Sequence, residues 1–292
     1  MSLNVRRRNV SAGVSIDSGD VRRSALEALS GPSASSHAKD DALSPRQFEQ
    51  LVDASYDVED DRMETECRML LFLAGRVGLR RGEIAHLSNE WIGLSDGTIT
   101  IPEHDRCTKG RHADEPCGYC RRRAKDRVDT ANVTHGEAVD AIRHVLDDPE
   151  GMSAEMIDSE AESLRDSIAL SMEDALAEQW RPKTPTSARR IPFDFDVRVD
   201  LALRSFSESF NGWEPSAATI NRRIDRVAEM SDVDCNVYPH SLRATAASYH
   251  ASRNISVHSL MSIMGWADPG TARVYVTGDA ESAAREVRSK HR

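Results

Sequence analysis

The stretch "YPHSLRATAAS" (residues 238–248) places a histidine and an arginine three positions apart in a segment otherwise made of small residues. The segment predicts a helix over 239–252. Residues three apart are neighbours on a helix, so His240 and Arg243 share one face. Such a pair is either a polar stripe on a surface helix or part of a site that handles a phosphodiester, and the rest of the chain must decide between the two.

Three further stretches accompany this one: "GLRRGEIAHL" (78–87), "PKTPTSARRIPF" (182–193) and "MGWADPGTARVYV" (264–276). Each is a weak signal alone. Their joint order and spacing resemble the tyrosine recombinases, the phage-integrase family, over about residues 43–290 apart from a long insertion. The resemblance implies a mainly α fold with a small antiparallel β-sheet. It also implies a site-specific recombinase that cleaves and rejoins DNA strands through a 3′-phosphotyrosyl intermediate.

The resemblance matches each catalytic residue of the family to one position of this sequence. Arg80 and Arg243 match the two arginines, and Tyr275 matches the nucleophile. His240 accompanies the second arginine, Trp266 stands where most members carry histidine, and Glu83 matches a supporting acid. Arginine can grip two phosphate oxygens while staying charged, and a tyrosine nucleophile needs neither metal nor nucleotide. No cofactor is therefore expected for catalysis.

The catalytic lysine has two candidates. Lys109 lies in "CTKGR", which resembles the family's hairpin loop, whereas Lys183 precedes an Arg-Ile-Pro strand, as the lysine does in many integrases. The interval from Lys183 to Pro192 fits the return of that hairpin. We therefore expect Lys183 to protonate the leaving 5′-oxygen.

The chain divides into an expected mobile tail over 1–42, with a short helix near 20–29, and a catalytic domain over 43–290. Order begins at a capping box formed by Ser44, Pro45 and Gln47. Strands are expected at 97–102 and 188–193, paired as a hairpin that an insertion over 103–181 interrupts. The remaining helices are expected at 195–210, 216–230, 239–252 and 256–264.

The insertion begins with two short-spaced pairs of metal-ligand residues in 104–120. His104-x2-Cys107 and Cys117-x2-Cys120 have the spacing of a tetrahedral zinc site. His112 is a rival to His104 as the fourth ligand. The alternative is a loop of reduced thiols. We expect a structural zinc ion, because four protein ligands leave no open position for catalysis.

A basic arm (121–127) follows the cysteines and precedes an acidic helix expected over 152–179. Its cations are Arg121, Arg122, Arg123 and Lys125. One interpretation is that the arm touches the DNA backbone. The other is a solvated charge run that balances the acidic helix.

Composition limits the class of protein. The 292 residues carry a formal charge of −10, only five lysines, five cysteines and no apolar run long enough to span a membrane. This predicts a soluble cytoplasmic protein. The acidic, lysine-poor composition is typical of proteins from a high-salt cytoplasm. The cysteine cluster resembles those in integrase-like proteins of salt-loving archaea. At about 1 M salt the screening length is roughly 3 Å, so the acidity is no evidence against a DNA partner.

Family members usually carry a DNA-clamping domain ahead of the catalytic one, whereas about forty residues precede Ser44 in this sequence, so a separate clamping partner is one expectation. The resemblance alone implies that the protein acts on double-stranded attachment-site DNA. It also implies a homotetramer whose subunits are linked by the residues after Tyr275. Two other functions stay open: a non-catalytic, zinc-bearing DNA-binding regulator and a topoisomerase that uses the same chemistry.

Overall fold

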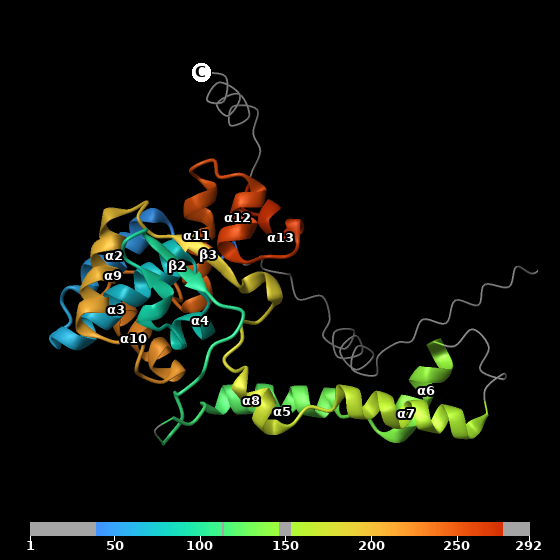
Figure 1. Cartoon of the computed structure of the whole chain (residues 1–292). Helices are drawn as coiled ribbons and strands as arrows, with labels where there is room; N and C mark the ends of the chain where they lie inside the picture. Colours follow the sequence, from blue (N-terminus) through green and yellow to red (C-terminus); the bar gives the residue numbers. More distant parts are fainter. Residues whose placement is uncertain (1–38, 113, 146–152, 277–292) are drawn as a thin grey trace, which may run out of the picture. The chain divides into compact units, whose positions relative to one another are not determined.

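The computed structural model describes residues 39–112, 114–145 and 153–276 (Figure 1). The expected tail and its helix at 20–29 lie outside these ranges, apart from residues 39–42. So does the segment after Val276 that was expected to link subunits. Within the described ranges, no helix combines the length and apolar character that a membrane crossing needs.

Six helical segments contribute buried side chains to the main apolar core (Figure 1). The helix α2 begins at the expected capping box, with the Ser44 hydroxyl accepting from the N–H of Gln47. The segments are α2 (Pro45–Ser55), α3 (Asp61–Phe72), the π-helix η1 (Leu73–Val77), α9 (Val197–Ser209), α10 (Ala217–Met230) and α11 (Pro239–Ala251).

The sheet has three antiparallel strands in the order β1 (Ile92–Gly93), β2 (Thr98–Ile101) and β3 (Arg189–Pro192). Ile99 pairs with Ile191 across β2 and β3, and both side chains are buried. The expected pairing across the insertion is confirmed; the short strand β1 was not expected. The fold is mainly α with a small antiparallel β-sheet, as expected.

Five further elements are short. They are α4 (Arg81–Ala85), the 3-10 turns η2 (Asn89–Trp91) and η4 (Pro185–Ser187), α12 (Val257–Met264) and α13 (Pro269–Arg273). The helix α12 begins at the expected Ser256 cap and ends at Gly265. It forms a second apolar cluster with parts of α11 and α13.

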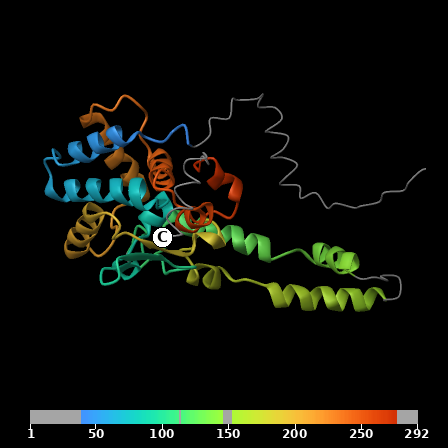
Figure 2. The same cartoon turned by 90° about the horizontal axis from the view of Figure 1, so that it is seen from above.

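The insertion consists of α5 (Gly118–Ala131), α6 (His135–Val145), α7 (Ala154–Ile168) and α8 (Met172–Ala177). The helices α6 and α7 lie side by side (Figures 1 and 2) around a small apolar cluster of their own. The expectation of one helix over 152–179 was wrong. The chain breaks after Ile168 because Leu170 bonds to Asn132 at both its N–H and its carbonyl, and Ser171 then caps α8.

Candidate functional site

Arg80 lies at the N-terminus of α4, directly after a sharp turn. Gly78 supplies the turn with φ of +80°, and a side chain there would also collide with a neighbouring methionine sulfur. The Arg80 guanidinium donates to Glu83 Oε1 at 2.9 Å, to Ser187 Oγ at 2.7 Å and to the carbonyl of Gly265 at 2.8 Å. Glu83 is a neighbour in the chain, whereas Ser187 and Gly265 come from distant segments, and together the three acceptors fix the side chain in one orientation.

Glu83 is a buried carboxylate that binds two arginines. Arg189 on β3 donates to both of its oxygens, at 2.8 and 3.0 Å, and the Arg80 backbone N–H donates at 2.8 Å. Burial opposes ionisation, but the hydrogen bonds from Arg189 and the charges of Arg189, Arg243 and Arg80 outweigh it, so the pKa of Glu83 is lowered. Glu83 therefore stays ionised and ties α4 to the sheet.

Arg243 is buried on the inner face of α11, with only 5 % of its surface exposed. Its guanidinium donates to the carbonyls of Gly78 and Met264. Burial and the nearby charge of Arg80 both lower its pKa. Arg80 and Arg243 thus lie close together although they are far apart in the sequence, and backbone carbonyls hold each of them.

Trp266 and Tyr275 stack on each other beside Arg243. Their ring centroids lie 5.4 Å apart with an interplanar angle of 21°. The guanidinium carbon of Arg243 lies 6.0 Å from the Trp266 ring centroid. Tyr275 is only 6 % exposed, and burial raises its pKa although the charge of Arg243 opposes the rise. Tyr275 is therefore a neutral phenol at pH 7.

His240 and Lys183 are both exposed. Partial burial lowers the pKa of His240, and the positive charges of Arg243, Lys183 and Arg80 lower it further. His240 therefore lies within electrostatic range of all three cations. Its imidazole is neutral at pH 7 and able to accept a proton.

Lys109, the rival lysine, lies in a different place. Its ammonium donates to the carbonyl of Trp213, and burial lowers its pKa while the neighbouring charges of Cys107 and Glu214 oppose the shift. Lys109 thus belongs with the cysteines of the insertion, whereas the charge of Lys183 acts on His240.

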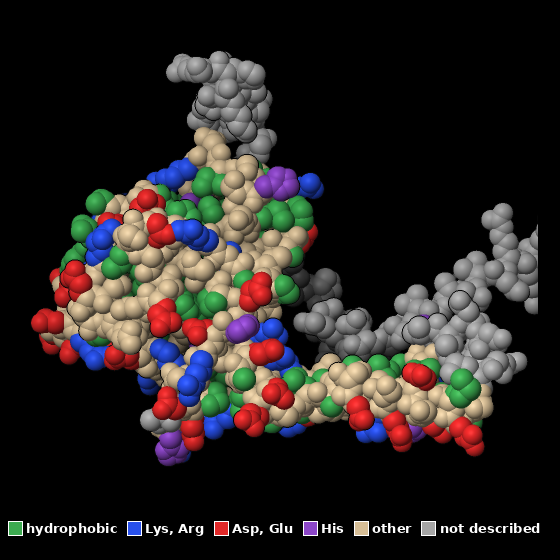
Figure 3. All heavy atoms as spheres, in the orientation of Figure 1, with side chains coloured by type: hydrophobic (Ala, Val, Ile, Leu, Met, Phe, Trp, Pro, Cys, Tyr) green, Lys and Arg blue, Asp and Glu red, His purple; other side chains and the backbone are tan. Residues whose placement is uncertain are grey.

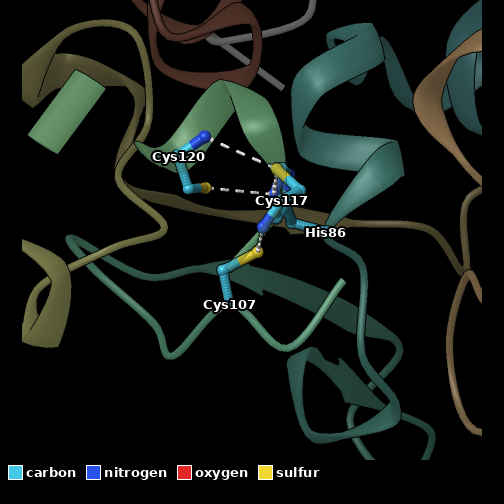
Figure 4. Close-up of side chains that lie close together, drawn as sticks. All are labelled: His86, Cys107, Cys117 and Cys120. Carbon is cyan, nitrogen blue, oxygen red and sulfur yellow. Dashed lines mark hydrogen bonds between the residues drawn. The ribbon is translucent and has the colours of Figure 1, made fainter. Parts of the chain in front are cut away.

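Four side chains form a group that could hold a metal ion: His86, Cys107, Cys117 and Cys120 (Figure 4). Their ligand atoms all lie within 4.8 Å of one another. His86 Nε2 lies 3.6 Å from Cys117 Sγ and 3.4 Å from Cys120 Sγ. Tetrahedral zinc with ordinary bond lengths would separate a nitrogen and a sulfur ligand by about 3.6 Å. The group is therefore close to the dimensions that a zinc ion requires.

The histidine of this group is not the expected one. His104 and His112 are both exposed and lie outside the group, whereas His86 is buried. His86 follows α4 in the core, far along the chain from the cysteines, so no short-spaced pair reveals it. The three expected cysteines are brought together, and the expectation of His104 as their partner is corrected to His86.

Hydrogen bonds around the group orient its ligands. His86 Nδ1 lies 2.9 Å from the carbonyl of Gly82, so Nδ1–H donates and Nε2 faces the thiols. The N–H of Cys117 donates to Cys107 Sγ, and that of Cys120 donates to Cys117 Sγ. Hydrogen bonds from the Cys107 and Cys120 thiols lower the pKa of Cys117. Outer contacts of this kind are usual around metal ligands.

The four basic residues of the expected DNA-contacting arm lie on α5: Arg121, Arg122, Arg123 and Lys125. Arg121 pairs with Glu115 and Lys125 with Asp129, while Arg122 and Arg123 have no ion-pair partner among the described residues. Acidic and basic side chains are interspersed on the visible face of the insertion helices (Figure 3). Two of the four cations of the arm are thus paired with acidic side chains.

Sequence reasoning missed several residues of this site besides His86. Ser187 contacts Arg80 and Arg189 contacts Glu83, and although both lie in the stretch 182–193, nothing in that stretch assigned them these contacts. Asp41 accepts from the Tyr238 hydroxyl at 2.7 Å, at the start of the helix that bears His240. These partners are recognisable only once distant segments are brought together.

Comparisons with known proteins gave matches among solved structures only. No protein-family model matches the chain, and no curated protein matches it. A crystal structure of XerA recombinase matches at 14% identity and a TM-score of 0.45, covering 86% of this chain and 63% of that one.

The integrase of transposon Tn1549, in complex with transposon right-end DNA, matches at 13% identity and a TM-score of 0.47, covering 85% of this chain and 65% of that one. The same integrase with a circular intermediate DNA matches at 14% identity and a TM-score of 0.48, with the same coverage. The chain thus spans somewhat less than two thirds of the length of these solved chains.

Proposed function

We propose that this protein is a tyrosine-type site-specific recombinase, which cleaves and rejoins double-stranded DNA through a 3′-phosphotyrosyl intermediate. The observation that carries the proposal is the convergence of Arg80, Arg243, Trp266 and Tyr275, which come from three separate parts of the sequence. Two fixed guanidinium groups beside a tyrosine suit the charge that develops on a phosphodiester under attack.

In the proposed step the Tyr275 phenol oxygen attacks phosphorus and the bond from phosphorus to the 5′-oxygen breaks. Arg80 and Arg243 stabilise the non-bridging oxygens. His240, neutral at pH 7, takes the phenol proton, and Lys183 supplies a proton to the leaving 5′-oxygen. The Trp266 indole N–H can donate to a phosphate oxygen but cannot act as a base. Attack by the 5′-hydroxyl of another strand reverses the step and rejoins the DNA.

We further propose that His86, Cys107, Cys117 and Cys120 hold one structural zinc ion. Three sulfurs and one nitrogen are a ligand set of structural zinc sites, and zinc there contributes folding free energy rather than catalysis. Three expectations stay predictions. They are that the cations of α5 contact the DNA backbone, that the protein forms a homotetramer on DNA and that a separate partner clamps the DNA.

The test is capture of a covalent adduct. The full chain is incubated in high salt with nicked duplexes of randomised sequence, whose short downstream piece diffuses away after cleavage. We expect a denaturation-resistant protein–DNA adduct, with the DNA attached to the peptide that contains Tyr275. Tyr275→Phe should abolish the adduct because phenylalanine has no nucleophilic oxygen.

Tyr56→Phe is the matched control. Tyr56 is an exposed tyrosine, so this substitution should leave the adduct unchanged. Sequencing of the captured DNA separates the alternatives. An enriched sequence supports a recombinase, adducts without sequence preference support a topoisomerase, and DNA binding without any adduct supports the non-catalytic regulator.

A further inference from the structure

The metal-ligand group and the proposed active site meet in one short helix. Arg80 is the residue that precedes α4 and His86 is the residue that follows it. The helix has only five residues, and Glu83 within it binds Arg189 of the sheet. Arg80 and His86 are therefore separated by a single short helix, which Glu83 ties to the sheet.

A second connection runs from His86 to the segment that carries Lys183. The His86 ring stacks on Trp180, with centroids 5.3 Å apart and an interplanar angle of 19°. Trp180 is buried and lies three residues before Lys183. Beyond Lys183 the chain reaches Ser187, whose hydroxyl accepts from Arg80 at 2.7 Å.

Hydrogen bonds beside the metal-ligand group join the two ends of the insertion. The N–H of Cys107 donates to the carbonyl of Gln179 at 2.8 Å, and that of Asp105 donates to the carbonyl of Trp180 at 2.7 Å. Cys107 thus lies where the insertion leaves the core, beside the segment by which it returns. Cys117 and Cys120 come from the start of α5. One ion would join the helix α4, the segment by which the insertion leaves the core and its first helix, and the N–H of Cys107 connects this group to the returning segment.

We propose that metal binding at His86, Cys107, Cys117 and Cys120 positions Arg80 and Lys183 for DNA cleavage. The ligands are positioning residues, since they act through α4 and the segment 179–187 without touching DNA. The inference rests on the proposed recombinase function. Without the ion, α4 is joined to Cys117 and Cys120 only by the long contacts between His86 Nε2 and the two thiols, at 3.6 and 3.4 Å. The stack of His86 on Trp180 then remains, but with less to hold it in place.

The test compares the zinc-loaded full chain with the same chain stripped by a chelator under reducing conditions and with Cys120→Ser. Cys235→Ser is the control, because Cys235 is an exposed thiol outside the group. Zinc is measured by mass spectrometry of the metal. Co²⁺ in place of zinc should give the absorption of a tetrahedral thiolate site in wild type and Cys235→Ser and lose it in Cys120→Ser.

Cleavage is then measured on the captured DNA sequence. We expect loss of metal to slow adduct formation about 10- to 100-fold, the scale of a small misplacement of catalytic groups, and added zinc to restore the rate in stripped wild type only. A DNA whose leaving 5′-oxygen is replaced by sulfur needs no proton from Lys183. Metal-free protein should therefore cleave the sulfur substrate in preference to the oxygen one, as Lys183→Ala should.

Wild-type cleavage rates in metal-free protein, or an unchanged preference between oxygen and sulfur, would overturn the inference. Hydrogen exchange gives a readout independent of activity. Amides of 81–87 and 179–188 should exchange faster without metal while those of α9 stay protected, and loss of protection throughout the chain would instead make the ion a general stabiliser. If the zinc-loaded wild type forms no adduct, the proposed function fails, and exchange alone decides whether the metal orders these two segments.

Discussion

At the scale of single residues, Glu83 is the centre of the proposed active site. Its buried carboxylate receives hydrogen bonds from Arg189 and from Arg80, and it lies in the field of Arg243. Three arginines would otherwise repel one another in a space with little water. The carboxylate is therefore needed for the cationic site to exist as well as for its geometry.

Glu83→Ala should lower the free energy of unfolding by about 3 to 5 kcal/mol, because it leaves Arg189 as an uncompensated buried charge. Urea denaturation followed by circular dichroism measures the change. Glu90→Ala, at an exposed position nearby, is the matched control and should change the free energy by less than about 0.5 kcal/mol. A Glu83→Ala loss as small as that of the control would contradict the role assigned to the carboxylate.

The pH dependence of this loss has a definite sign. The pKa of Glu83 is lowered below its ordinary value of 4.5, so its stabilisation is complete above about pH 4.5 and is lost as the pH falls through the lower pKa of the folded state. The difference between wild type and Glu83→Ala should shrink below pH 4.5. A difference that grows there would show that the wild-type carboxyl is protonated in the folded protein.

At the scale of elements, helix ends could be predicted more reliably than helix interiors. Ser44 and Ser256 cap α2 and α12 as expected, because a cap depends on a hydroxyl and the next turn only. The π-helical turn η1 was not anticipated. It packs against α11, and the Arg76 guanidinium lies 3.6 Å from the centroid of Phe48, a contact made by a distant helix.

Ser44→Ala should destabilise the protein by about 1 kcal/mol, because the N–H of Gln47 loses its acceptor at the start of α2. Ser44→Asp supplies another acceptor and should restore most of the loss. Thermal and urea unfolding of the two variants measure the difference. Equal losses in Ala and Asp would show that the capping bond contributes nothing.

At the scale of the whole molecule, the helices α6 and α7 are a separable part of the insertion. Their apolar cluster, which includes Val139 and Ile157, is distinct from the main core. The pair is closed at its base by two 3.0 Å hydrogen bonds between Asn132 and Leu170. Nothing in this pair belongs to the metal-ligand group or to the proposed active site.

Replacement of residues 133–169 by a short Gly-Ser linker should therefore leave the core folded and the metal content unchanged. The Asn132–Leu170 contact brings the two cut ends close enough for such a linker to join them. Metal analysis and urea denaturation test this, with the intact chain as reference. A lost metal or an unfolded core would show that α6 and α7 support the rest of the protein. If metal and core survive, adduct yield would then report whether the pair contributes to DNA cleavage.

The sequence by itself determined the features that depend on local chemistry and chain order. Helix caps, the two paired strands that flank the insertion and the order of the motifs around Arg80, Arg243 and Tyr275 could all be predicted from adjacent residues. The proximity of Cys117 and Cys120 could be predicted as well, because short spacing brings two thiols to one point regardless of the rest of the fold. Cys107 joins them although the histidine expected beside it, His104, lies outside the group.

Only the tertiary structure decided which distant groups complete each site. His86 rather than His104 faces the cysteines because α4 and the base of the insertion pack together, and Arg189 reaches Glu83 because β3 returns beside α4. Such contacts depend on the path of the whole chain, and no residue near His86 or Arg189 encodes them. The physical reason is that burial and hydrogen bonding are optimised over the entire core, whereas a sequence motif records only neighbours along the chain.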